Sequence, residues 1–105
     1  MMIMHQNESE TLLFLEECEI LMDIIQIFYF KTNHQRYQFP CVSLISEIKY
    51  LQEKLLRSLD NGEKKWKNTY CNVSRQLKKV EEEFQELEET FSWFKNNSII
   101  VARSG

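Results

Sequence analysis

The chain has 105 residues, which is enough for one domain with a modest core, and 43% of them are hydrophobic, too many for a chain that is disordered throughout. Two glycines and one proline disfavour a β-sandwich, which needs a turn at about every 8 to 12 residues, so an all-α fold is predicted for a single domain over residues 1–105. The formal net charge of −3 argues against a general binder of nucleic acid or anionic membranes.

The first helix is predicted over residues of about 9–31, with Ser9 or Thr11 as its cap. Its polar residues gather on one side, and apolar residues occupy most of the remaining circumference. These apolar residues include Leu12, Leu13, Phe14, Leu15, Ile20, Leu21, Met22, Ile24, Ile25, Ile27, Phe28 and Tyr29. Such a helix must be covered on more than one side, by two helices of the same chain or by another subunit.

Residues 32–42 are predicted to be a connection, because they are mostly polar and Pro40 disfavours helix at the residue before it. A second helix is predicted over about 43–59. Its apolar face contains Leu44, Ile48, Leu51, Leu55 and Leu59.

The segment from Asp60 to Glu63 is the strongest local signal for a stop and a restart, since it contains an Asn-Gly pair and suits a capping box between its first and last residues. Leu51 and Trp66 are 15 residues apart, one more than two heptads, which also favours separate helices. One continuous helix with a skip residue is the alternative. A third helix is predicted over about 61–97, followed by a short tail over 98–105.

The third helix carries apolar residues at alternating steps of four and three, a heptad pattern that places them on one stripe, here called the seam. The seam consists of Trp66, Tyr70, Val73, Leu77, Val80, Phe84, Leu87, Phe91 and Phe94. The predicted fold is therefore an all-α, three-helix antiparallel bundle, or helical hairpin, with a long heptad-patterned C-terminal helix. Burial of the seam by other helices is the expected mode of packing.

Charge is unevenly distributed along the third helix, with basic residues over 64–79 and acidic residues over 81–89. Antiparallel pairing of two copies would bring opposite charges together in a homodimer and form layers such as Trp66 with Phe91 of the second copy. An up-down-up bundle satisfies the same charges within one chain, because the first helix begins with acidic residues. Both arrangements are consistent with the pattern.

Three aromatic residues are candidate anchors for a protein partner. Trp93 lies off the seam, where a polar residue is usual, and Phe28 and Tyr29 belong to the surplus apolar surface of the first helix. The alternative for Trp93 is packing against the apolar residues 99–101 of the tail.

A basic aromatic cluster spans residues 64–67 together with Tyr70 and suggests contact with nucleic acid. Because Trp66 and Tyr70 also belong to the seam, the structural interpretation is favoured, and we expect no nucleic-acid partner.

The sequence contains no pattern typical of an enzyme or a metal site. His5 and His34 have no acidic or cysteine partner at helical spacing, and the pairs Glu16 with Glu19 and Glu82 with Glu86 have no accompanying histidine. Cys18, Cys41 and Cys71 are far apart and form no C-x-x-C motif. We therefore expect no catalytic residue, cofactor, metal or small-molecule substrate.

The expected location is intracellular, cytoplasmic or nuclear, because residues 1–7 lack the basic start of a signal peptide and residues 12–30 contain four acidic side chains that disfavour a membrane span. The expected function is a non-enzymatic interaction or scaffold subunit that assembles by coiled-coil-like helix packing. Two alternatives remain open. The first is a helical regulator that masks a groove on another protein, and the second is a lineage-restricted helical protein with no recognisable partner motif.

Overall fold

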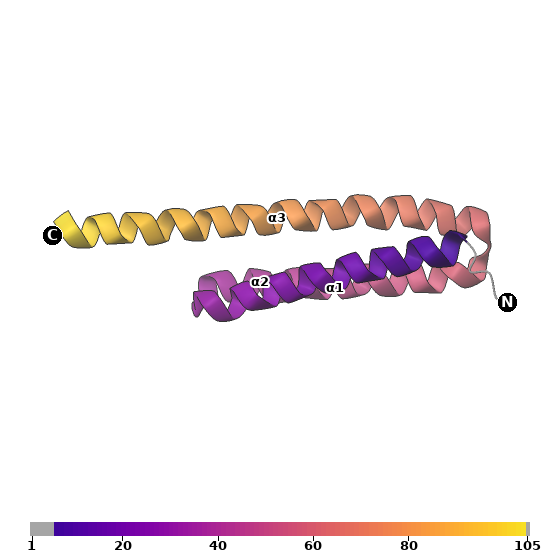
Figure 1. Ribbon diagram of the computed structural model, residues 1–105, viewed down its shortest axis with the longest axis horizontal. Helices are drawn as coiled ribbons and strands as arrows, with labels where there is room; N and C mark the ends of the chain where they lie inside the picture. The colour runs from indigo at the N-terminus through magenta and orange to yellow at the C-terminus, as the bar shows by residue number, and fades with distance from the viewer. Residues whose placement is uncertain (1–5, 105) are drawn as a thin grey trace.

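The computed structural model describes the backbone of residues 6–104 and the side chains of residues 7–97. Three α-helices follow one another, α1 (Gln6–Thr32), α2 (Gln35–Ser58) and α3 (Glu63–Ser104), with a short 3-10 helix η1 (Leu59–Asn61) before α3. Helix α2 runs antiparallel to both α1 and α3, so that α1 and α3 are parallel (Figure 1). The predicted all-α bundle of three helices is confirmed, and the described residues form no strand.

The connection between α1 and α2 consists of Asn33 and His34 alone, so the prediction of a connection over 32–42 is wrong. His34 begins the second helix as its N-cap, because its Nδ1 atom accepts a hydrogen bond of 3.1 Å from the Arg36 amide. Asn33 takes a positive φ of 47°, which asparagine tolerates better than most residues and which reverses the chain direction.

Pro40 lies inside α2. It is close to the helix start, and its missing N–H removes one helical bond, the one to the carbonyl of Arg36. The first turns of α2 are stabilised by burial of Tyr37 and Cys41, which are 7% and 0% exposed. Packing of these two side chains therefore outweighs the local preference against helix that the proline indicated.

Helices α2 and α3 are separate elements, so the alternative of one continuous helix is wrong. Gly62 connects η1 to α3 with a φ of 93°, a conformation that suits glycine. Its carbonyl accepts a 3.0 Å bond from the Trp66 amide. The cap position is therefore Gly62, and the predicted capping box starting at Asp60 is wrong, because Asp60 belongs to η1.

Helix α3 continues to Ser104, so residues 98–104, predicted as a tail, extend the helix instead. Because the turn between α1 and α2 comes well before the end of α3, the last turns of α3 project beyond the other two helices (Figure 1). The side chains of residues 98–105 lie outside the described part of the chain.

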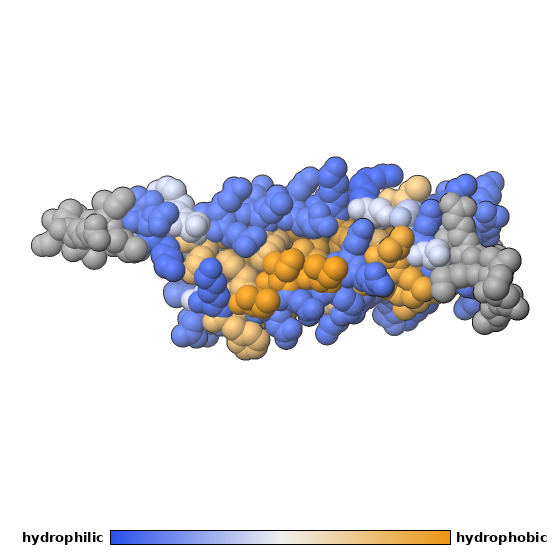
Figure 2. Space-filling model, viewed as in Figure 1, coloured by the Kyte–Doolittle hydropathy of each residue, from blue (hydrophilic) through white to orange (hydrophobic). Residues whose placement is uncertain are grey.

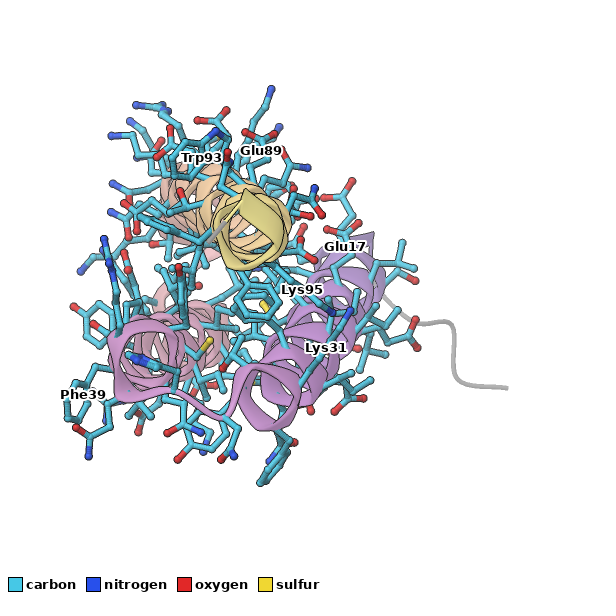
Figure 3. All side chains as sticks on the ribbon, turned by 90° about the vertical axis from the view of Figure 1, so that its left-hand side faces the viewer. Glu17, Lys31, Phe39, Glu89, Trp93 and Lys95 are labelled. Atoms are coloured by element: carbon cyan, nitrogen blue, oxygen red, sulfur yellow. The ribbon has the colours of Figure 1, made fainter. Side chains whose placement is uncertain are left out.

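The core lies along the axis of a triangle formed by the three helices, as the end-on view shows (Figure 3). Each helix contributes one face, and the apolar side chains at most 9% exposed are Phe14, Cys18, Leu21, Met22, Ile25, Phe28, Tyr37, Cys41, Leu44, Ile48, Leu51, Leu55, Trp66, Val73, Leu77, Val80 and Phe84. On α1 this buried face takes less than half of the apolar residues that the sequence offers, and the rest are half-buried or exposed.

Candidate interaction surface

The seam of α3 faces α1 and α2 of the same chain. Five of its members are at most 3% exposed, namely Trp66, Val73, Leu77, Val80 and Phe84. Three more, Tyr70, Leu87 and Phe91, are half-buried against this core. Phe94 is 37% exposed, and the Arg36 guanidinium lies 4.7 Å from the centre of its ring. The surface that would pair two copies through the seam is thus occupied within one chain.

Phe28 is a core residue, so its prediction as a partner anchor is wrong. It is 6% exposed, and its ring centre lies 5.4 Å from those of Phe84 and Phe91, in edge-on contacts. Tyr29 is half-buried beside the core, with its ring 5.2 Å from that of Phe30. Neither residue offers a free aromatic side chain of the kind that anchors a partner.

Trp93 is 59% exposed and lies on the side of α3 that points away from α1 and α2 (Figure 3). Its ring contacts the edge of the Phe94 ring at 4.9 Å between centres. The alternative, packing against side chains of residues 99–101, concerns side chains outside the described residues. Trp93 is therefore available at the surface of the projecting end of α3.

Helix α1 exposes a row of large aliphatic side chains, here called the α1 stripe and defined as Leu13, Ile20, Ile24 and Ile27. They are 60%, 61%, 45% and 67% exposed. The steps of seven, four and three between them keep all four on one side of the helix. On the face shown in Figure 2, orange surface gathers along the middle of the molecule and is bordered by hydrophilic surface.

Three members of the α1 stripe, Leu13, Ile20 and Ile24, line an open groove between α1 and α3, here called the α1–α3 groove. Its first stretch has a volume of about 330 Å³ and is lined by Glu17, Ile20, Leu21, Ile24, Glu81, Phe84, Gln85 and Glu88. A second stretch of about 310 Å³ is lined by Leu13, Phe14, Glu17, Tyr70, Ser74, Leu77, Lys78 and Glu81. The two stretches are neighbours, because Glu17 and Glu81 line both of them.

Helix α2 exposes apolar side chains too, but the pocket that Tyr50 lines between α2 and α3 has a volume of about 180 Å³ and is otherwise lined by polar residues. Phe39, Val42 and Tyr50 are 68%, 51% and 59% exposed. Phe39 points straight away from the bundle (Figure 3). Isolated exposed apolar residues are normal on soluble proteins, whereas a contiguous apolar band is typical of an interaction site.

The basic aromatic cluster does not present its aromatic rings. Trp66 is 2% exposed and stacks on half-buried Tyr70 at 5.1 Å between ring centres, while Lys64, Lys65 and Lys67 are exposed. Stacking of a base on these rings would require the bundle to open.

The side chains that could act as catalytic groups or metal ligands are dispersed over the structure. His34 serves as the cap of α2, and His5 lies outside the described residues. Glu19 accepts a 3.1 Å hydrogen bond from the Gln52 amide of α2, which makes it part of the helix packing. Cys18 and Cys41 are buried and Cys71 is exposed, all as free thiols. Within the described residues no three histidine, cysteine, aspartate or glutamate side chains come together as metal ligands would.

None of the described helices has the length and apolar content needed to span a membrane. Comparisons of the chain with protein-family models, with curated proteins and with solved structures found no match.

Proposed function

We propose that this protein is a non-enzymatic interaction module that binds a protein partner along the α1 stripe. The observation that carries the proposal is the row of four aliphatic side chains, each at least 45% exposed, along one side of a helix whose neighbouring side forms the core. Leaving such a row in water is unfavourable, at about 25 cal/mol for each Å² of apolar surface. Binding of a partner there would remove this cost.

Packing of a partner helix is the mode that the groove supports best. A helix placed between α1 and α3 would contact the α1 stripe on one side and α3 on the other, as a fourth helix does in a bundle. The proposal therefore retains the predicted coiled-coil-like packing, but it places the partner on α1. The antiparallel homodimer through the seam, one of the two arrangements that the charge pattern left open, competes with the bundle, because the same residues form the core.

The projecting end of α3 supports a second candidate surface. Trp93 is exposed there, and tryptophan is enriched among the residues that dominate binding energy at interfaces. This surface lies on the opposite side of α3 from the core, so a partner bound there would leave the α1–α3 groove open (Figure 3). Replacement of Trp93 by alanine separates the two candidates, since it would affect only the second.

The proposal is tested by polar substitutions on α1 with matched substitutions on α2. Partners that copurify with the wild-type chain from its native cells should not copurify with the variant Ile20→Gln/Ile24→Gln. The control Val42→Gln/Tyr50→Gln removes comparably exposed apolar side chains on the outer side of α2 and should keep them. The free energy of unfolding of both variants should lie within about 0.5 kcal/mol of the wild-type value, because exposed positions contribute little to stability.

Retention of all partners by the α1 variant, or equal loss of partners from the α2 control, would refute the proposal. A loss confined to Trp93→Ala would favour the second surface.

A further inference from the structure

The α1 stripe is bordered by acidic side chains on α1 itself. Glu16 lies three residues after Leu13 and four before Ile20, and Asp23 lies at the same spacings from Ile20 and Ile27, so each is a neighbour on the helix surface. Both carboxylates are exposed. Glu17 borders the other edge of the stripe, at the groove (Figure 3).

The opposite rim of the groove, on α3, is also mainly acidic. Glu81 and Glu88 line it together with Gln85. Among the described groove residues three are acidic, Glu17, Glu81 and Glu88, and one is basic, Lys78. Beyond the groove, Lys31 and Lys95 lie at the end of the bundle (Figure 3). The central part of the groove therefore combines an apolar wall and floor with negatively charged edges.

The acidic residues at the groove also affect the buried thiol of Cys18. Its pKa is raised from 9.0 to about 12, first by burial and then by the carboxylates of Glu17, Glu19 and Glu81. Glu17 and Glu81 come from the two sides of the groove, so their fields converge on the core beneath it.

A second copy of the chain does not match this surface. Two α1 stripes placed face to face would bring the carboxylates of Glu16, Glu17 and Asp23 close to those of the other copy, and like charges at an interface disfavour pairing. The basic half of α3 is no substitute, because the apolar side chains between its lysines are in the core.

We propose, on the basis of the proposed function, that the α1–α3 groove binds an amphipathic helix of another protein whose apolar face is flanked by lysine and arginine. The apolar residues of that helix would contact the α1 stripe and the floor residues Leu21 and Phe84. Its basic residues would lie beside Glu16 and Asp23 on one edge and Glu81 and Glu88 on the other.

The dimensions fit a helix of ordinary length. From Leu13 to Ile27 the stripe extends for about 21 Å at 1.5 Å per residue, which about four turns of a partner helix would cover. Ion pairs at the exposed rims contribute mainly to the choice and orientation of the partner, while the apolar contacts supply most of the affinity.

The test uses two fluorescent peptides of about 18 residues with leucines at helical i, i+3, i+4, i+7 spacing. One has lysine at the flanking positions and the other has glutamate. Fluorescence anisotropy with the full chain should show that the lysine peptide binds about tenfold more tightly or better, and that this preference shrinks as salt is raised. Ile20→Gln/Ile24→Gln should abolish binding of both peptides.

A charge reversal with a matched control identifies the groove. Glu81→Lys/Glu88→Lys should weaken binding of the lysine peptide by about tenfold, because both carboxylates line the groove. Glu82→Lys/Glu86→Lys makes the same change in net charge at exposed positions of α3 that do not line the α1–α3 groove, and it should change the affinity by less than about twofold.

Equal weakening by the two charge reversals would mean general attraction between opposite charges and would overturn the inference. So would tighter binding of the glutamate peptide. Absence of peptide binding together with a molar mass of twice 12.7 kDa that depends on Ile20 and Ile24 would identify a second copy as the occupant, and it would overturn the inference but leave the proposed function intact. If the wild-type chain binds neither peptide and captures no partner that depends on Ile20 and Ile24, both the inference and the proposed function are refuted.

Discussion

The indole nitrogen of Trp66 donates a 2.9 Å hydrogen bond to the hydroxyl oxygen of Thr11, and both side chains are 2% exposed. The Thr11 hydroxyl in turn donates to the carbonyl of Asn7 at 2.6 Å. This chain of bonds joins the start of α1 to the start of α3 and fixes their relative position. The prediction that Ser9 or Thr11 caps the first helix is wrong, since α1 begins at Gln6 and both residues lie within it.

Thr11→Val should lower the free energy of unfolding by about 1–3 kcal/mol, because the buried indole N–H loses its acceptor. Trp66→Phe should cost at least as much, since it loses both the bond and buried area. The double variant should lose about 1 kcal/mol less free energy of unfolding than the sum of the two single losses. Urea unfolding followed by circular dichroism measures all three. Strict additivity would mean that the two side chains do not interact.

Pro40→Ala should stabilise the protein by about 1–3 kcal/mol, because alanine restores the N–H that can bond to the Arg36 carbonyl inside α2. The expected readout is a higher urea midpoint with an unchanged dependence on urea. A lower midpoint would mean that the ring of Pro40 contributes packing that outweighs the missing bond.

Gly62→Ala should destabilise the protein by about 1–3 kcal/mol, owing to the backbone conformation alone. Its φ is 93°, and a Cβ atom added there meets no atom within 4 Å. Asn33→Gly is the control at the other turn, where a φ of 47° suits both residues, and it should change stability by less than about 0.5 kcal/mol. An equally small effect at Gly62 would show that the turn before α3 differs from the one described.

The stability of the bundle should decrease as the pH rises above about 9. Burial raises the pKa of Cys41 to about 11, and burial with nearby carboxylates raises that of Cys18 to about 12, from an ordinary value of 9.0. Below pH 9 both thiols are protonated in the folded and the unfolded chain. Between pH 9 and 11 they ionise only in the unfolded chain, which lowers the free energy of unfolding by about 1.4 kcal/mol per pH unit and thiol.

Urea unfolding at pH values from 8 to 10.5 measures this decrease. Cys18→Ala/Cys41→Ala should reduce the slope relative to Cys71→Ala, which removes a thiol outside the core. The thiol interpretation fails if the slope is the same in all three proteins.

The sequence was sufficient to predict three helices and the buried side of the third. The heptad spacing from Trp66 onward places one stripe on one side of a helix, and Trp66, Val73, Leu77, Val80 and Phe84 are indeed in the core. It was insufficient at the start of α2, where local signals from Pro40 and the polar residues before it pointed to a loop. The ring of Tyr37 packs 6.4 Å from Phe28 and 5.2 Å from Phe91, contacts that no local pattern contains.

The candidate site was predictable only in part. The excess of apolar residues on α1 indicated that some would remain exposed, but periodicity could not tell which side of this helix would face its neighbours. Phe28 was predicted as an anchor and is in the core, while Leu13 and Ile20 are at the surface. That choice depends on how α2 and α3 lie against α1, which is a tertiary property.

The most direct test of the docking surface is the methyl NMR spectrum of the isoleucine residues during titration with the lysine-flanked peptide. The methyl signals of Ile20, Ile24 and Ile27 should shift, whereas those of fully buried Ile48 on α2 should stay in place. Shifts spread evenly over all isoleucines, or no shift on α1 at saturating peptide, would contradict the proposed docking surface.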